Sequence, residues 1–292
     1  MLWHNLAVTS PLTPGRTVDL HLHTIRSDGR WTPRQVVEQA AARGLAAIAV
    51  TDHDVVGGLE EASHAAQAVG IELVAGIELT ADWDGRTIHV LGHGIDPTEP
   101  TLLAALLRAE RTMAAHVERV LEALADAGAP LDAAKLEKYR VKYAGGASLV
   151  LAMVEQGVLR RAKNASKLLR LAADEPRGYT ATEAISLIHT AGGVASLAHP
   201  VKIRKGRPLL DAADLAPLLD AGLDGIEVWQ IVHGPRERDH YAALADANGL
   251  LAVGGSDCHG PSSSKPARMG SQRIPYSAFE QLSERIGRPS LR

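Results

Sequence analysis

The first strand pattern of the chain reads Val18-Asp19-Leu20-His21-Leu22-His23, and it sets the interpretation of everything after it. Apolar and ionisable residues alternate, so Asp19, His21 and His23 share one face of the strand and the leucines share the other. Two imidazoles spaced by two residues on one face can bind a single metal ion. Taken alone, the pattern equally fits a polar strand face with hydrogen-bonded core histidines.

Outward from this segment, short apolar runs alternate with helix patterns. We expect further strands at Ala46–Thr51, Ile71–Gly76, Thr87–Gly92, Val194–Ala198, Gly225–Gln230 and Leu251–Gly255. We expect helices between them at Thr32–Arg43, Leu59–Val69, Ala181–Ala191, Asp211–Ala221 and Arg236–Asn248. Strands that are apolar on both faces are typical of buried parallel sheets, so the alternation predicts an α/β barrel or a doubly wound sheet. The pair Asp84-Gly85 is typical of a hairpin turn and argues against an ideal eightfold barrel.

The alternation stops between Asp96 and about Arg177, where the residues become rich in Ala, Leu, Arg and Glu. The segment Leu102–Ala127 has the 3.6-residue periodicity of a long helix. We therefore expect three parts. They are an N-terminal tail at 1–16, a catalytic barrel formed by 17–98 and 177–292, and an inserted helical domain at 99–176.

Composition excludes several classes of protein. The chain has 292 residues, a formal charge of -3 and 3% aromatic residues, which disfavours a binder of long nucleic acid. Its single cysteine excludes a disulfide framework and a cysteine-based zinc site. No apolar run reaches the ~18–20 residues that span a bilayer, and the first sixteen residues lack the features of a signal peptide. We therefore expect a cytoplasmic protein without a membrane partner.

The thirteen histidines are the unusual entry in this composition, and their positions carry the functional prediction. The end of every expected strand except the sixth carries a His, Asp or Glu, and His233 follows the sixth. The carboxyl ends of strands are where α/β folds build active sites. A cluster of imidazoles and carboxylates is costly without cations and suits Zn²⁺, Mn²⁺ or Fe²⁺. The sequence therefore predicts a metal centre with several ions.

Six motifs, in chain order, resemble those of the PHP (polymerase and histidinol phosphatase) family. They read DLHLHTxxSDG, VTDHD, GIE, IHVLG, AHP and GSDCHG, and the resemblance covers roughly residues 17–275. The chain is most similar to free-standing bacterial phosphoesterases of this family that carry an inserted helical domain, including 3',5'-nucleotide bisphosphate phosphatases. The resemblance implies a distorted seven-stranded (β/α)7 barrel, similar to a TIM barrel, with a helical insertion domain. It also implies two or three divalent metal ions at the carboxyl ends of the strands.

The resemblance further implies nine metal ligands in this sequence. They are His21, His23 and Asp257 for one ion, His89 and His199 for a second, Asp28, His53 and His259 for a third, and Glu78 as a bridging carboxylate. Asp19 and Asp52 are expected to orient the imidazole rings by accepting hydrogen bonds from the ring N–H groups that do not face the metal.

The implied activity is hydrolysis of phosphate monoesters by a metal-activated hydroxide. The expected substrates are small phosphorylated metabolites, in particular nucleotides such as 3',5'-nucleoside bisphosphates or AMP. Asp52 and His233 are the candidates for proton transfer. The Arg-Pro-His element of the nucleotide-phosphatase relatives is absent from this chain, so we expect Arg177, Lys202 and Arg268 to bind the substrate.

Other activities remain open at this point. A 5'-3' exoribonuclease would use the same metal centre on short RNA. A histidinol phosphate phosphatase fits the helical insertion less well. A non-catalytic regulatory module is disfavoured because such modules usually lose ligands, whereas all nine matched positions are present here.

Overall fold

We describe the protein from a computed structural model. The structure describes residues 16–132, 146–161, 164–173, 176, 178–203, 209–261 and 266–287. The chain divides into two compact units. The first unit comprises Met1–Leu103 and Tyr179–Arg292, and the second comprises Ala104–Gly178.

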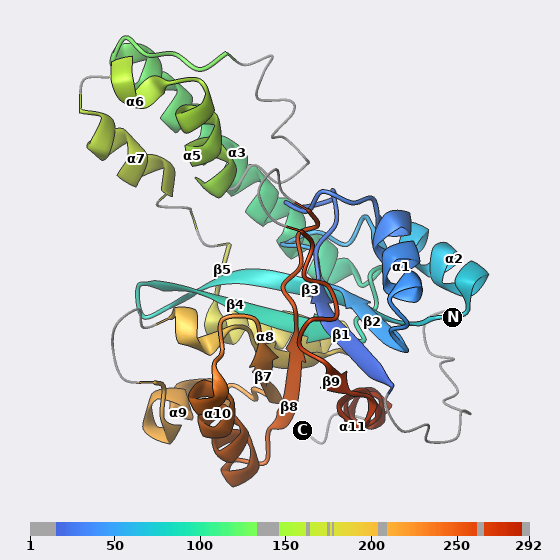
Figure 1. The fold of residues 1–292 in the computed structure, drawn as a ribbon. Helices are drawn as coiled ribbons and strands as arrows, with labels where there is room; N and C mark the ends of the chain where they lie inside the picture. The colour runs from blue at the N-terminus through green and yellow to red at the C-terminus, as the bar shows by residue number, and fades with distance from the viewer. Residues whose placement is uncertain are drawn as a thin grey trace. The chain divides into compact units, whose positions relative to one another are not determined.

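The first unit is a mixed α/β fold built on one curved sheet (Figure 1). Its strands are β1 (Thr17–Leu22), β2 (Ala47–Val50), β3 (Glu72–Trp83), β4 (Arg86–His93), β5 (Tyr179–Thr180), β6 (Val194–Leu197), β7 (Gly225–Gln230), β8 (Leu251–Gly255) and β9 (Ile274–Pro275). The hydrogen-bonded order is β8-β7-β6-β4-β3-β2-β1-β9, and β5 pairs with β3. All seven expected strands are therefore present.

The sheet curves so that β8, at one end of the strand order, meets β1 near its other end. Leu22 forms a parallel bridge with Cys258. The His23 amide donates to the Cys258 carbonyl at 3.1 Å, and the Asp257 amide donates to the His21 carbonyl at 3.0 Å. The result is a nearly closed barrel of eight strands. The expected count of seven needs correction, because the two-residue strand β9 pairs antiparallel with the beginning of β1 and is too short to leave a periodic pattern.

The hairpin expected at Asp84-Gly85 is confirmed. The strands β3 and β4 pair antiparallel on either side of it, and β4 is also antiparallel to β6. Asp84 and Gly85 have φ values of 53° and 75°, the two left-handed residues that a tight hairpin turn requires. The reversed strand β4 interrupts the parallel arrangement, so the barrel is distorted.

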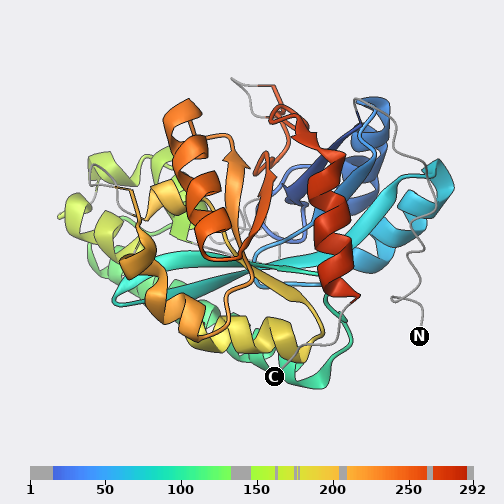
Figure 2. The same cartoon turned by 90° about the horizontal axis from the view of Figure 1, so that it is seen from below.

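Helices cover the outer side of this sheet. They are α1 (Pro33–Ala42), α2 (Leu59–Val69), α8 (Ala181–Thr190), α9 (Ala212–Asp220), α10 (Pro235–Ala247) and α11 (Tyr276–Ile286), with a 3₁₀ turn η1 (Pro200–Lys202). Helix α8 packs against β4, α10 against β7 and α11 against β8 (Figure 2). The start of α1 shows why the sequence sets these boundaries. Thr32 and Gln35 form a capping box, and Pro33 lies between them at the first position of the helix.

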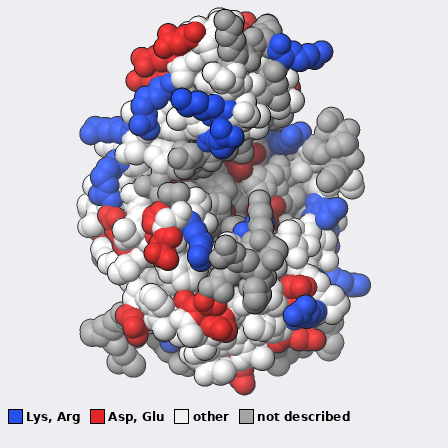
Figure 3. Space-filling view, turned by 90° about the vertical axis from the view of Figure 1, so that its left-hand side faces the viewer, with Lys and Arg blue, Asp and Glu red and all other residues white. Residues whose placement is uncertain are grey.

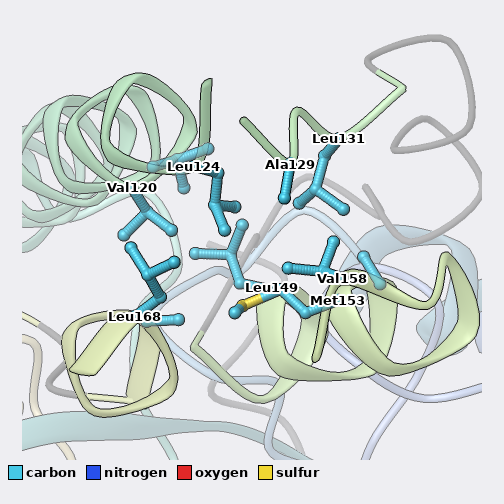
Figure 4. Close-up of a cluster of buried hydrophobic side chains, with 11 residues drawn as sticks. Val120, Leu124, Ala129, Leu131, Leu149, Met153, Val158 and Leu168 are labelled. Atoms are coloured by element: carbon cyan, nitrogen blue, oxygen red, sulfur yellow. The ribbon is translucent and has the colours of Figure 1, made fainter. Parts of the chain in front are cut away.

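The second unit consists of helices with a hydrophobic core of their own. The helices are α3 (Pro100–Asp126), which begins at the end of the first unit, α5 (Gly146–Glu155), α6 (Val158–Arg161) and α7 (Ala165–Ala173). Val120 and Leu124 of α3 pack with Met153 of α5, Val158 of α6 and Leu168 of α7 (Figure 4). Among the residues that the structure describes, no helix is both long enough and apolar enough to cross a membrane.

Candidate metal centre

The side chains of all nine expected ligands lie in the first unit and cluster around one buried carboxylate. They come from the end of β1 (His21 and His23), the turn that follows it (Asp28), the end of β2 (His53), β3 (Glu78), β4 (His89), the end of β6 (His199) and the segment after β8 (Asp257 and His259). Because the parallel strands all point the same way, their carboxyl ends deliver these side chains to one end of the barrel.

Glu78 is the centre of the cluster, and its side chain is fully buried. Its Oε2 lies 3.0 Å, 3.1 Å and 3.4 Å from ring nitrogens of His21, His23 and His53, and its Oε1 lies 2.9 Å and 3.0 Å from those of His89 and His199. One carboxylate thus contacts five imidazoles, an arrangement suited to a group shared between metal ions.

Three overlapping sets of ligand atoms lie within 4.8 Å of one another. They are His23, Asp28, His53 and His259; His21, His23, Glu78 and Asp257; and His53, Glu78 and His89. His199 belongs to none of these sets but contacts both Glu78 and His89, the latter at 3.2 Å.

The donor set fits divalent metal ions. The Nε2 atoms of His21 and His23 face each other at 3.1 Å, so the two imidazoles direct their ring nitrogens to a common point. The Nδ1 atom of His23 is buried without a hydrogen-bond partner. Nitrogen and carboxylate donors that converge in this way suit Zn²⁺, Mn²⁺ or Fe²⁺, and a buried cation satisfies such donors where protein partners do not.

The protonation equilibria show how strongly these groups interact. Burial alone would raise the pKa of Glu78, but the nearby His21, His53 and His89 hold it well below its usual range. Burial alone would lower the pKa of His23, but hydrogen bonds to Asp257 and Glu78 raise it to about 10. Without metal, positive charge from protons compensates the buried carboxylates. The centre is therefore built to hold positive charge.

The reversed direction of β4 decides which of its histidines reaches the centre. His89 pairs with Thr80 on β3, whereas His93 pairs with Gly76 nearer the beginning of that strand. His93 is buried deeper in the barrel, and its Nε2 lies 2.8 Å from the Leu20 carbonyl oxygen. Burial lowers the pKa of His93 to about 4, so the ring is neutral at physiological pH and serves the core.

Two of the expected ligands have strained backbones. His199 has a φ of 28° and Asp257 a φ of 53°, a left-handed region that residues other than glycine rarely occupy. Each residue lies two positions after the last residue of a strand, β6 or β8. Such strain persists where surrounding contacts enforce it, and it concentrates at functional sites.

Asp52 and Asp19 contact the backbone and hydroxyl groups near the ligands. Asp52 accepts hydrogen bonds from the Thr24 amide at 2.7 Å, the Thr24 hydroxyl at 2.7 Å and the Ser27 hydroxyl at 2.6 Å. These bonds hold the turn that carries Asp28. Asp19 accepts from the Ser256 and Gly270 amides, both at 2.8 Å. The carboxylate that contacts Nδ1 of His21, the ring nitrogen directed away from Glu78, is that of Glu227 rather than Asp19 or Asp52.

The other expected site residues lie in different surroundings. Lys202, in η1, places its Nζ 2.7 Å from Asp257 Oδ2 and is 41% exposed. His233 follows β7 and is buried, with its Nδ1 3.0 Å from the Val228 carbonyl oxygen. Arg268 is exposed in the segment after β8, and Arg177 lies outside the described residues.

Glu227 contacts two of the expected ligands but was not predicted from the sequence. It lies within β7 and is fully buried, with Oε1 3.0 Å from His21 Nδ1. Its Oε2 accepts the His199 amide at 2.6 Å. The signal was present, because an acidic residue inside the apolar segment Gly225–Gln230 needs a buried partner.

Comparison with known proteins agrees with this geometry. Residues 19–191 match the PHP domain family. The chain is 36% identical over 255 residues to a 3',5'-nucleoside bisphosphate phosphatase of Chromobacterium violaceum, an alignment that covers 84% of this chain and 87% of that protein. It is 32% identical over 255 residues to a 5'-3' exoribonuclease of Haemophilus influenzae, covering 83% of this chain and 90% of the relative.

The fold has a close counterpart among solved structures. A crystal structure from Bifidobacterium adolescentis, of a protein described as a metal-dependent phosphoesterase, matches with a TM-score of 0.78 at 28% identity. The match covers 95% of this chain and 100% of the other. Sequence motifs, clustered ligands, family match and relatives lead to the same assignment. The chain belongs to the PHP domain family and is a metal-dependent phosphoesterase, a hydrolase of phosphoric esters.

Proposed function

We propose that the protein hydrolyses phosphate monoesters of small phosphorylated nucleotides, with 3',5'-nucleoside bisphosphates as preferred substrates and AMP as a further candidate. The observation that carries the proposal is Glu78, whose two oxygens contact imidazoles on both sides at the carboxyl end of the barrel. The relative with 36% identity, a 3',5'-nucleoside bisphosphate phosphatase, supports the substrate class.

We propose that the nine ligands hold two or three ions of Mn²⁺, Fe²⁺ or Zn²⁺. His21, His23 and Asp257 would hold one ion, His89 and His199 a second, and Asp28, His53 and His259 a third, and Glu78 would be shared between ions. The contacts of Glu78 with both His21 and His199 support its shared role. We likewise propose that the first compact unit is the catalytic barrel. The second compact unit would be the inserted helical domain, expected at 99–176.

When bound, the ions lower the pKa of a coordinated water, polarise the phosphoryl oxygens and offset the charge on the leaving oxygen. In the overall reaction the oxygen of water bonds to phosphorus, the phosphorus–oxygen ester bond breaks, and the released alcohol oxygen takes a proton. Lys202 binds a phosphate oxygen through its partly exposed ammonium group, which already lies beside Asp257. The charge of Lys202 persists at neutral pH, because Asp257 raises its pKa against the effect of burial.

The remaining expected residues stay predictions. For Asp52, the contacts with Thr24 and Ser27 support a role in holding the Asp28 turn more directly than a role in proton transfer. His233 stays a candidate for proton transfer, and burial lowers its pKa toward a neutral ring. Arg177 and Arg268 stay candidates for binding the substrate.

A second activity, 5'-3' exoribonuclease action on short RNA, is favoured by the similar identity to the Haemophilus influenzae enzyme. Long nucleic acid is a poor candidate. On the face shown in Figure 3, Lys and Arg side chains gather on the upper part and are mixed with Asp and Glu below it, so no single basic surface covers the face. Binding of a long polyanion relies on such a surface.

The deciding experiment is a substrate screen with Mn²⁺. The panel contains nucleoside monophosphates, 3',5'-bisphosphates, short 5'-phosphorylated RNA, sugar phosphates and histidinol phosphate. We expect the highest kcat/KM for a 3',5'-bisphosphate. Turnover of RNA alone, or of histidinol phosphate alone, would replace the proposal with that activity. No turnover by a protein that binds no metal would indicate a regulatory module.

Ligand variants test the centre itself. Asp257→Ala and Glu78→Ala each remove a carboxylate that contacts both His21 and His23. We expect each variant to lose bound metal and phosphatase activity together. Full activity in either variant with its metals retained would contradict the proposed ligand scheme.

A further inference from the structure

Glu227 is an acidic side chain buried completely inside β7. Burying a carboxylate costs several kcal/mol unless hydrogen bonds compensate the charge, so its partners indicate why the chain keeps it there. Each oxygen has one partner, and the two partners belong to different expected ligand residues, His21 and His199.

The first partner is the imidazole of His21. Its Nδ1 lies 3.0 Å from Glu227 Oε1, while its Nε2 lies 3.0 Å from Glu78 Oε2. A carboxylate can only accept, so Nδ1 donates to Glu227, and without a metal ion Nε2 donates to Glu78 in the same way. A metal ion would take the place of the Nε2 proton, while Glu227 keeps the proton on Nδ1. The contact with Glu227 selects the tautomer in which His21 can bind a metal ion through Nε2.

The second partner is the backbone of His199. Its amide donates to Glu227 Oε2 at 2.6 Å, and its backbone is left-handed with φ 28° and ψ 58°. The ring of His199 lies 3.0 Å from Glu78 Oε1 through Nε2. The hydrogen bond from the His199 amide to Glu227 therefore holds the strained backbone conformation that directs this ring at the centre.

We propose that Glu227 is a positioning residue that aligns His21 and His199, one ligand from each of two sub-sites, through a single rigid carboxylate. Acting from β7, it links the end of β1 to the end of β6. The inference rests on the proposed metal centre, because it assigns a role toward that centre.

The variant Glu227→Gln separates this role from simple packing, because it keeps the size of the side chain. The His199 amide can only donate, so the glutamine oxygen has to face it. The glutamine NH₂ group then faces His21 Nδ1, which has to accept. The proton of His21 moves to Nε2, and that nitrogen loses the lone pair needed for metal binding.

We expect Glu227→Gln to lower the affinity for Mn²⁺ by about 10- to 100-fold, measured by titration calorimetry and by metal content after dialysis. The spectroscopic readout uses the Zn²⁺-loaded protein, which is diamagnetic. In the wild type, ¹⁵N NMR of the histidine rings should show His21 protonated at Nδ1, with this proton hydrogen-bonded and slow to exchange. The variant should lose that signal.

Asp224→Asn is the matched control. Asp224 Oδ2 also contacts a histidine ring, at 2.7 Å from His189 Nε2, and a backbone amide, at 3.0 Å from Ala195 N. His189 is not an expected ligand. This variant loses the same kind of contacts, so its Mn²⁺ affinity should equal that of the wild type.

Three outcomes would overturn the inference. The first is an unchanged Mn²⁺ affinity in Glu227→Gln, and the second is an equal loss in Asp224→Asn. The third needs only the wild type, and so holds even if the variant fails to fold: His21 protonated at Nε2 in the Zn²⁺-loaded protein. A wild type that binds no metal is a different failure, because it overturns the proposed centre and this inference with it.

Discussion

Asp257 uses its two oxygens for different purposes. Oδ1 faces Nε2 of His21 and Nε2 of His23, at 3.5 Å and 3.3 Å. Oδ2 accepts hydrogen bonds from Lys202 at 2.7 Å and from Gln230 at 3.3 Å. The carboxylate is thus oriented by a cation that is itself partly exposed, and we propose that this cation binds the phosphate of the substrate.

At the scale of one residue, we therefore predict that Lys202→Met raises KM for a nucleotide substrate by about 10- to 100-fold, the equivalent of one hydrogen bond to a charged group. Steady-state kinetics with saturating Mn²⁺ measures the effect. The control is Lys167→Met, which removes an exposed lysine of α7 in the second unit. An unchanged KM in Lys202→Met, or an equal rise in both variants, would contradict the phosphate-binding role.

Residues of the centre differ in how far the sequence predicts them. His53 and His199 were predicted because each lies within three residues after an apolar strand, the position where α/β folds place active-site groups. Glu227 was missed because it lies inside its strand, where only a partner on another strand explains a charge. The contacts of Asp52 with Thr24 and Ser27 depend on how a turn folds back, which spacing alone does not specify.

At the scale of elements, closure of the barrel depends on how near β8 comes to β1. A side chain on Gly255 would place its Cβ 2.1 Å from the Cβ of His21 and 2.5 Å from the backbone nitrogen of His21. Real Cβ atoms do not approach so closely, so β1 or β8 would have to shift. Since β1 carries two expected ligands, the absence of a side chain on Gly255 connects strand packing with the metal centre.

We predict that Gly255→Ala lowers the free energy of unfolding by about 1–3 kcal/mol, the usual cost of overpacking, and weakens metal binding by displacing His21. Thermal unfolding and Mn²⁺ titration measure the two effects. Gly57→Ala is the control, because a Cβ at this exposed position meets no atom within 4 Å. A Gly255→Ala protein with wild-type stability and metal affinity would show that the two strands tolerate a wider separation.

Asp224 connects several elements at the beginning of β7. It accepts hydrogen bonds from His189 of α8, from the Ala195 amide of β6 and from Arg285 of α11. Burial alone would raise the pKa of Asp224, but these three partners lower it below the ordinary value of 3.8. The ionised form therefore stabilises the folded protein above that value, and the stabilisation is lost as the pH falls through the lowered pKa.

We predict that Asp224→Asn costs about 1–3 kcal/mol of stability at pH 7, the range for hydrogen bonds to a charged group, and that this difference shrinks as the pH falls below about 4. Chemical denaturation of the two proteins between pH 2.5 and pH 7 measures it, with both held free of metal. Asp239→Asn, at an exposed position of α10, should match the wild type throughout. A cost that stays constant down to pH 2.5 would mean that the charge of Asp224 contributes nothing.

Elements were predictable to the degree that they are long and regular. The five helices expected in the first unit begin and end within one residue of those observed, since caps such as Thr32 mark their ends. The expected strand Ile71–Gly76 continues as β3 to Trp83, because its second half pairs with β4 in the hairpin and gains its partners there. The two-residue strands β5 and β9 exist only through pairing with distant segments.

At the scale of the whole molecule, charge is distributed unequally between the two units. Between Ala104 and Gly178 there are thirteen Lys and Arg residues and nine Asp and Glu residues, whereas the whole chain carries a net charge of -3. The first unit, which contains every expected ligand, is therefore clearly acidic. An acidic unit that binds phosphate esters needs cations, and this requirement agrees with metal ions as the main source of positive charge at the site.

The separate cores of the two units lead to a prediction about metal removal. All nine expected ligands belong to the first unit, while α5 and α7 pack on the hydrophobic cluster of the second. Metal at 100 times its Kd stabilises the form that binds it by about 2.7 kcal/mol. Hydrogen–deuterium exchange before and after chelation should therefore show faster exchange at the ends of β1, β3 and β8, restored by Mn²⁺, with little change in α5 and α7. Equal loss of protection in both units would show that they unfold together, and no loss in the barrel would count against a metal centre there.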